Sequence, residues 1–199
     1  MGNPLAAIGK VLVTIRDAAF PLYDNWKVNK ELREKLENEE GILPYIENAD
    51  KVTVKHLEKE YENTIYTKDK VEDKAKTNVA GITIAVTLIM GASGLLDTVI
   101  KKYPIPELQW ASFILLSFSI AYLIIAGILS IMVLIAENVL YTVDLSCIAD
   151  GGEKLKKAYD KSVRQNQSQN LIRNNYIYSS YECIRNALIC LFVIFLLSS

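Results

Sequence analysis

Two long uncharged apolar segments constrain this chain more strongly than any other feature of its sequence. They read NVAGITIAVTLIMGASGLL over residues 78–96 and ASFILLSFSIAYLIIAGILSIMVLIA over residues 111–136. Each is long enough for a helix to cross the ~30 Å hydrocarbon core of a bilayer. Neither shows the alternation of a barrel strand, and a lipid-exposed backbone must be helical or part of a closed barrel. We therefore predict a transmembrane helical hairpin.

A third apolar segment, ALICLFVIFLL, lies near the C-terminus. A span of ~20 residues that ends at Leu197 begins at about Tyr178. The predicted third span, 178–197, thus includes Glu182 and Arg185 near one end. We expect an all-α integral membrane protein, whose long helices form a transmembrane bundle with a cytoplasmic helical extension.

Residues 1–50 form the first of three predicted parts of the chain. Apolar residues recur at three- and four-residue steps between Ile8 and Leu22, which predicts an amphipathic N-terminal helix. Beyond Pro21, Leu32 and Leu36 continue a helical pattern among charged residues. The apolar face can lie on the membrane surface or bind a partner. We favour the simpler interpretation, in which it packs on the protein's own helices.

Residues 51–150 and 151–199 form the other two parts. A helix from about Val52 meets no Pro or Gly before Gly81, so we expect it to run directly into the first span. Apolar residues between positions 139 and 148 can prolong the second membrane helix into water. A final helix begins at about Glu153, includes the stretch RQNQSQN, which is polar on all sides, and continues into the third span.

Basic residues near the span ends predict the orientation. Lysines precede the first span, and further Lys and Arg side chains lie between the second and third spans, whereas the hairpin loop contains only Lys101 and Lys102. Cytoplasmic loops carry the excess of Lys and Arg. We therefore predict a multipass protein of the cell membrane with a cytoplasmic N-terminus and an external hairpin loop.

The basic residues also form a candidate lipid-headgroup site. If the three helices pack together, we expect the basic side chains to gather at one depth and attract anionic phospholipids, at about 1 kcal/mol per residue. The alternative is that they only determine topology. The candidate residues are Lys74, Lys76, Lys154, Lys156, Lys157, Lys161, Arg164, Arg173 and Arg185.

Two polar features of the spans invite a functional interpretation. Glu137 leaves the second span where Arg185 and Asn186 enter the third, which predicts an interhelical polar contact; separate snorkelling of each side chain is the alternative. Small and hydroxyl residues also recur along the spans, which is typical of close helix packing. A polar seam that lines a water path is the other interpretation, with Thr83, Thr87, Ser112, Ser119 and Ser130 as its residues.

Motifs of catalysis are missing from the sequence. It contains no Gly-rich phosphate loop, no H-E-x-x-H and no G-x-S-x-G, so we do not expect an enzyme or a cofactor. His56 has no Cys or second His spaced to join it as a metal ligand, and Cys147, Cys183 and Cys190 form no C-x-x-C pair. A net charge of −1 argues against direct nucleic-acid binding.

Two segments resemble a group of small prokaryotic multipass proteins. They are KVEDKAKTNVAGITIAVTLIMGASGLL, a charged lead into a Gly-containing span, and NLIRNNYIYSSYECIRNALICLFVIF, an Asn- and Tyr-rich helix that enters a terminal span. The group comprises membrane effectors of immune systems, including SLATT-like effectors and the membrane-effector partners of short prokaryotic Argonautes. The resemblance covers about half of the chain.

The resemblance implies a homo-oligomeric effector of antiviral defence by abortive infection. Such a protein stays silent until a cytoplasmic sensor signals infection, then engages anionic lipid and depolarises the membrane. This chain shows no nucleotide-binding motif, so we expect a sensor protein rather than a second messenger to deliver the signal. The alternatives are a non-toxic anchor or adaptor that recruits a cytoplasmic partner, and a small subunit of a larger membrane complex.

Overall fold

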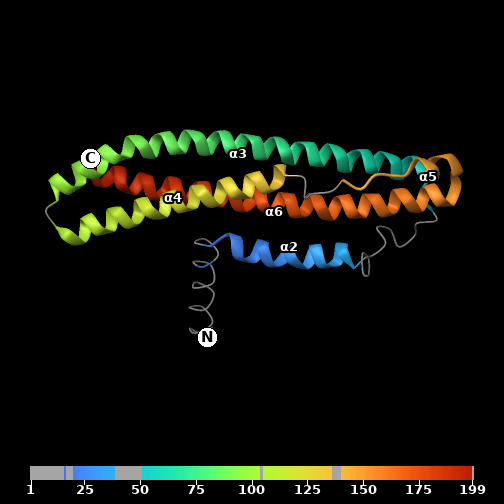
Figure 1. Cartoon of the computed structure of the whole chain (residues 1–199), viewed down its shortest axis with the longest axis horizontal. Helices are drawn as coiled ribbons and strands as arrows, with labels where there is room; N and C mark the ends of the chain where they lie inside the picture. The colour runs from blue at the N-terminus through green and yellow to red at the C-terminus, as the bar shows by residue number, and fades with distance from the viewer. Residues whose placement is uncertain (1–15, 17–19, 39–50, 104, 136–139, 199) are drawn as a thin grey trace, which may run out of the picture.

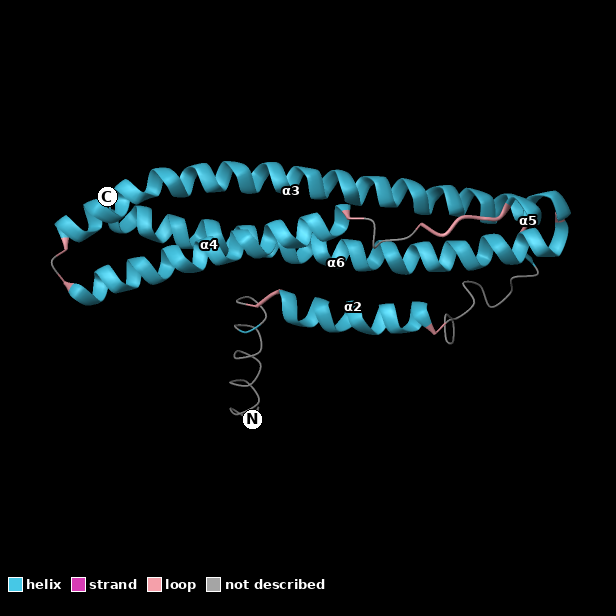
Figure 2. Cartoon of the chain, in the orientation of Figure 1, coloured by secondary structure: helices cyan, strands magenta, loops and turns pink. Residues whose placement is uncertain are grey.

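The computed structural model describes residues 16, 20–38, 51–103, 105–135 and 140–198. No strand occurs among these residues, which confirms the all-α fold class (Figure 2). The helices drawn in Figure 1 are α2 (Leu22–Glu37), α3 (Val54–Lys102), α4 (Pro106–Leu134), α5 (Leu145–Asp150) and α6 (Gly152–Ser198).

Local sequence explains where the long helices begin. Thr53 caps α3, because its hydroxyl accepts a hydrogen bond from the backbone N–H of His56 at 3.4 Å. Pro106 occupies the start of α4, where a missing N–H costs nothing. Gly151 and Gly152 have φ values of 66° and 56°, which glycine adopts readily, and they reverse the chain between α5 and α6.

Helices α3 and α6 lie side by side along the whole length of the molecule and run in the same direction (Figure 1). Two hydrogen bonds fix this parallel register: Asn170 Nδ2 donates to the Thr64 carbonyl at 2.8 Å, and Asn78 Nδ2 donates to Ser180 Oγ at 3.1 Å. Helix α4 runs antiparallel to both and covers only one half of the pair. The predicted uninterrupted helix into the first span is therefore confirmed as α3.

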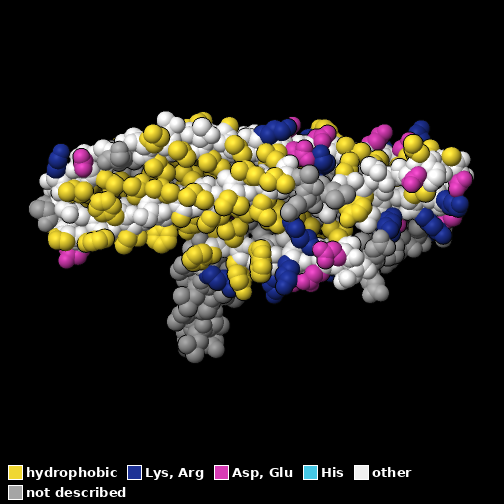
Figure 3. Space-filling view, in the orientation of Figure 1, with side chains coloured by type: hydrophobic (Ala, Val, Ile, Leu, Met, Phe, Trp, Pro, Cys, Tyr) yellow, Lys and Arg dark blue, Asp and Glu magenta, His cyan; other side chains and the backbone are white. Residues whose placement is uncertain are grey.

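Helices α3, α4 and α6 are each long and apolar enough to cross a membrane. We call the part formed by residues 78–102, 106–134 and 180–198 the membrane half. Its outer surface exposes large apolar side chains, such as Ile84, Ile124 and Phe192, which are 65%, 59% and 60% exposed. Figure 3 shows this surface as a broad yellow band. In lipid such a surface is well solvated, so the chain is a multipass membrane protein.

The second membrane helix ends earlier than expected. Helix α4 stops at Leu134, and Ile135 is already extended, with φ −76° and ψ 144°. The expectation that the helix continues through positions 139–148 is therefore wrong. Residues 140–144 are not helical, and the Tyr141 backbone instead pairs with the Asn166 side chain, which donates to its carbonyl at 3.0 Å and accepts from its N–H at 2.8 Å. This amide replaces the intrahelical hydrogen bonds of Tyr141.

We call the remaining part of the bundle, residues 54–77, 140–150 and 152–179, the distal half. Helix α2 packs antiparallel to α6, where Asn29 Nδ2 donates to the Ile172 carbonyl at 3.3 Å. Helix α2 thus packs on its own protein, but the docking interpretation was made for the segment between Ile8 and Leu22, which lies almost wholly outside the described residues. The shared core contains Leu36, Val71, Ala75, Leu129, Val133, Ile172, Tyr176 and Ile177.

Candidate functional site

A layer of buried polar side chains marks the level at which the three spans begin. Ser180 on α6 has no exposed surface, and its hydroxyl donates to the Ala126 carbonyl of α4 at 3.0 Å. Since its one proton is used there, Ser130 must be the donor in the Ser130–Ser180 contact of 2.9 Å. Asn78 of α3 donates to the same Ser180 oxygen. This boundary layer, formed by Asn78, Ser130 and Ser180, holds all three helices at one depth.

Amide side chains of α6 continue this polar contact into the distal half. Asn166 and Asn170 are 1% and 6% exposed, and both reach Thr64 of α3, through its hydroxyl at 3.4 Å and its carbonyl at 2.8 Å. Buried amides are costly unless they are hydrogen-bonded, so these contacts specify the pairing of α3 with α6. The stretch that looked polar on all sides is therefore largely an interhelical contact.

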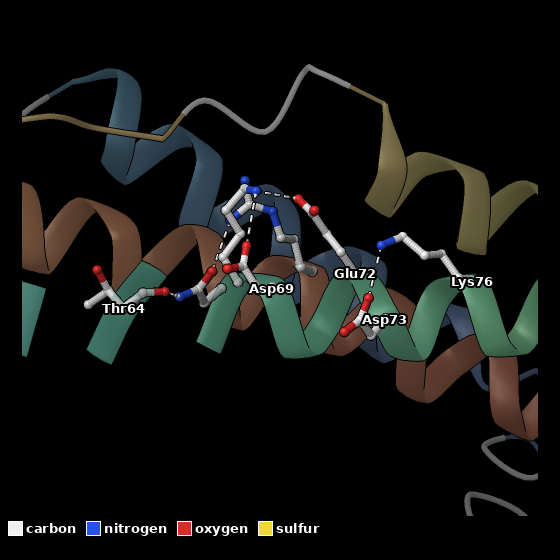
Figure 4. Close-up of polar contacts among 8 residues, drawn as sticks. Thr64, Asp69, Glu72, Asp73 and Lys76 are labelled. Carbon is white, nitrogen blue, oxygen red and sulfur yellow. Dashed lines mark hydrogen bonds and ion pairs between the residues drawn. The ribbon is translucent and has the colours of Figure 1, made fainter. Parts of the chain in front are cut away.

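Arg173 is buried among these amides, at 1% exposed, and donates to Asn170 Oδ1 at 2.9 Å. Burial lowers the pKa of Arg173, and the nearby Glu72 carboxylate opposes this shift. An arginine pKa lies so far above neutrality that the guanidinium stays charged. Figure 4 shows the α3 side of this cluster, where Glu72 is labelled. The Glu72 carboxylate forms an ion pair with the Lys68 ammonium at 2.8 Å.

A groove between α3 and α6 opens next to this cluster. Lys70 and Lys74 lie one helical turn apart on its α3 wall, and Leu171 and Asn174 lie on its α6 wall. Its volume is about 390 Å³, and both lysines are exposed. Lys74 precedes Asn78 by one turn, so its backbone lies about 6 Å from the boundary layer. We call this the lysine groove; Lys74 is the lysine nearer to the boundary layer, and the Lys70 ammonium lies over the Tyr66 ring, 4.4 Å from its centroid.

The structure divides the predicted headgroup residues into separate groups. Lys74 lies in the lysine groove, and Lys76 lies nearby, where a hydrogen bond from its ammonium to Asp73 at 2.9 Å raises the pKa of Lys76. Arg173 is buried and faces the interior. The prediction of a single depth is wrong for Lys154, Lys156, Lys157, Lys161 and Arg164, because α6 is continuous and places them about 20 to 36 Å of helix before Tyr178.

Arg185 lies inside the membrane half, about 8 Å of helix beyond Ser180. Its guanidinium forms an ion pair with Glu182 and donates to Asn186 Oδ1 at 3.2 Å, all on α6. The register set by Ser119, which donates to the Ala187 carbonyl at 3.0 Å, places Arg185 opposite the middle of α4. Arg185 therefore does not lie level with the end of the second span, as the predicted contact with Glu137 requires. Glu137 itself lies outside the described residues.

The hydroxyl residues of the spans do not form one seam. Ser112, Ser119 and Ser130 are buried, and each makes a hydrogen bond to a protein atom. Thr83 and Thr87 are exposed on the outer face of α3, and their hydroxyls bond carbonyls of their own helix, each at 3.0 Å. The packing interpretation therefore fits the serines, and the threonines face lipid or another chain.

Sequence reasoning missed the boundary layer and the amide contacts. The signal that could have found them is the density of Asn, Gln and Ser in α6, since amides buried in a helix bundle usually pair with neighbouring helices. Within the described ranges no group of three His, Cys, Asp or Glu side chains is placed to hold a metal ion.

No protein-family model matches the chain, and neither the curated proteins nor the solved structures contain a match.

Proposed function

We propose that this protein is a membrane-perturbing effector of prokaryotic antiviral defence, resident in the cell membrane with its N-terminus and distal half in the cytoplasm. The observation that carries the proposal is the continuity of α3 and α6, which run unbroken from the distal half through the boundary layer into the spans. A cytoplasmic sensor protein that binds the distal half can thereby displace the spans. Displacement requires two packings of the same helices that differ by only a few kcal/mol.

Oligomerisation is part of the proposal. The buried serines leave no continuous polar path within one protomer among the described residues. Conduction or depolarisation therefore requires several copies. The outer face of α3 supplies a suitable surface, because Thr83, Thr87 and Gly91 are small and exposed, and small residues permit close helix approach in lipid.

Anionic phospholipid is the proposed membrane ligand, bound at the lysine groove. In a dye-release experiment we expect the purified protein to permeabilise phosphatidylcholine vesicles that contain phosphatidylglycerol, and to spare pure phosphatidylcholine vesicles. The double variant Lys70→Gln and Lys74→Gln should bind the anionic vesicles about 2 kcal/mol more weakly, because each basic residue near the surface contributes about 1 kcal/mol. Dye release from the anionic vesicles should fall in proportion to the loss of binding.

The control is Lys154→Gln with Lys157→Gln, two exposed lysines of the distal end. They lie several Debye lengths from the boundary layer, so release should be unchanged. Equal loss in both double variants would contradict a specific role for the lysine groove. Release that does not depend on phosphatidylglycerol would contradict the lipid ligand altogether.

A non-toxic membrane anchor or adaptor is the second candidate, and the tight serine contacts favour it, because they describe spans that pack without water. In that case α2 and the distal half recruit a cytoplasmic partner and the spans only hold the complex at the membrane. Vesicles that stay intact under every lipid composition, with the protein stably inserted, would support the anchor over the effector. A small subunit of a larger complex would give the same result but would co-purify with other membrane proteins.

A further inference from the structure

Helix α2 crosses the level of the boundary layer. Asn25 Nδ2 donates to Ser179 Oγ at 2.7 Å, and Ser179 adjoins Ser180 of the boundary layer. Because α2 is antiparallel to α6, residues before Asn25 lie on the membrane side and residues after it lie on the water side. Leu22 and Tyr23 therefore lie on the membrane side, next to the exposed ion pair between Arg16 and Asp24 at 3.5 Å.

The side chains of α2 match this placement. Tyr23 and Trp26 are 57% and 58% exposed, although both have large apolar rings. Tyr and Trp concentrate at membrane interfaces, where an apolar ring and a polar tip are both accommodated. Lys30 and Arg33 follow one and two turns further along, on the water side.

A cleft between α2 and the pair α4 and α6 joins these two environments. Its volume is about 310 Å³. Leu129 and Met132 of α4 and Trp26 of α2 provide its apolar wall, and Lys30 and Arg33 lie at its water-facing end. An amphiphile is the ligand class that fits an apolar wall at the level of the boundary layer with cations just above it.

We propose that this α2 cleft binds one anionic glycerophospholipid from the adjacent leaflet. Its acyl chain lies against Leu129 and Met132, and its phosphate is held by Lys30 and Arg33. Arg33 is oriented by Tyr176, since its Nη2 donates to the Tyr176 hydroxyl at 3.2 Å, and Lys30 is only loosely paired with Glu34 at 3.8 Å. Arginine suits phosphate because its planar fork can form two parallel hydrogen bonds. The site needs only insertion into a bilayer and does not depend on the proposed effector function.

The chain carries two tryptophans, Trp26 and Trp110, which allows a direct test by fluorescence quenching. In the Trp110→Phe variant, the emission of Trp26 is measured in phosphatidylcholine vesicles with a fixed fraction of brominated phosphatidylglycerol, and in matched vesicles with brominated phosphatidylcholine. We expect stronger quenching by the brominated phosphatidylglycerol. The local enrichment should be about fivefold for each basic residue involved.

The variants Lys30→Gln and Arg33→Gln should each reduce the preference for brominated phosphatidylglycerol. Lys30 is exposed, so its replacement should not disturb folding. The matched control is Lys27→Gln with Lys35→Gln, two exposed lysines of α2 outside the cleft, which should keep this preference. Equal quenching by both brominated lipids would overturn the proposal. The proposal would also be overturned if the control variant, Lys27→Gln with Lys35→Gln, reduced the preference as much as Lys30→Gln with Arg33→Gln. That result would indicate general attraction of lipid to the charged surface.

Discussion

Replacing Asn166 with leucine is expected to lower the free energy of unfolding by about 3 kcal/mol, because each buried polar group left unpaired costs about 1–3 kcal/mol. Asn166 is 1% exposed, and its amide pairs with both the N–H and the carbonyl of Tyr141 and with the Thr64 hydroxyl. Leucine has a similar volume but satisfies none of these groups. Thermal unfolding in detergent should show the transition about 6–12 °C lower.

Asn174→Leu is the matched control, since Asn174 lies on the same helix and is exposed. Its effect should stay within about 0.5 kcal/mol. If the two variants unfold at the same temperature, the amides of α6 do not hold the distal half together.

Enlarging Ala187 to leucine is expected to destabilise the membrane half by about 1–3 kcal/mol, the usual cost of overpacking a filled core. Ala187 has no exposed surface, packs with Ala85 and Leu123, and accepts the Ser119 hydrogen bond through its carbonyl. A larger side chain must separate α6 from α3 and α4. The measurement is unfolding in detergent, followed by the loss of helical circular dichroism.

Ala121→Leu provides the comparison, because Ala121 is exposed on α4 within the same span and a larger apolar side chain there meets only lipid. Its stability should match that of the unmodified protein. A destabilisation of similar size in Ala121→Leu would mean that the lipid-facing and helix-facing sides of α4 have been exchanged.

The sequence predicts the elements of this fold well and their alignment poorly. Length and hydropathy indicate the three spans, and the absence of Pro and Gly before Gly81 indicates the continuous helix α3. Hydropathy reports how each residue partitions, which depends on that residue alone. It does not report which residue of α6 lies opposite which residue of α3.

Register is decided by contacts between residues far apart in the chain. Asn78 and Ser180 are separated by 102 positions, as are Thr64 and Asn166. The continuity of α6 in turn places Lys157 about 30 Å of helix before Tyr178, far from the boundary layer. The predicted basic cluster failed because charge alone does not indicate depth. Lys74 does lie close to the boundary layer, because the apolar segment begins four residues later.

A depth measurement along α6 tests most directly whether the bundle is divided into a membrane half and a distal half. Single nitroxide labels are placed at the exposed positions 157, 171, 188 and 192 in vesicles, and their collisions with oxygen and with a water-soluble nickel complex are compared. We expect nickel to reach positions 157 and 171, oxygen to dominate at positions 188 and 192, and the change to occur near Ser180. Labels at 157 and 192 with the same accessibility would contradict the division of the bundle into a membrane half and a distal half.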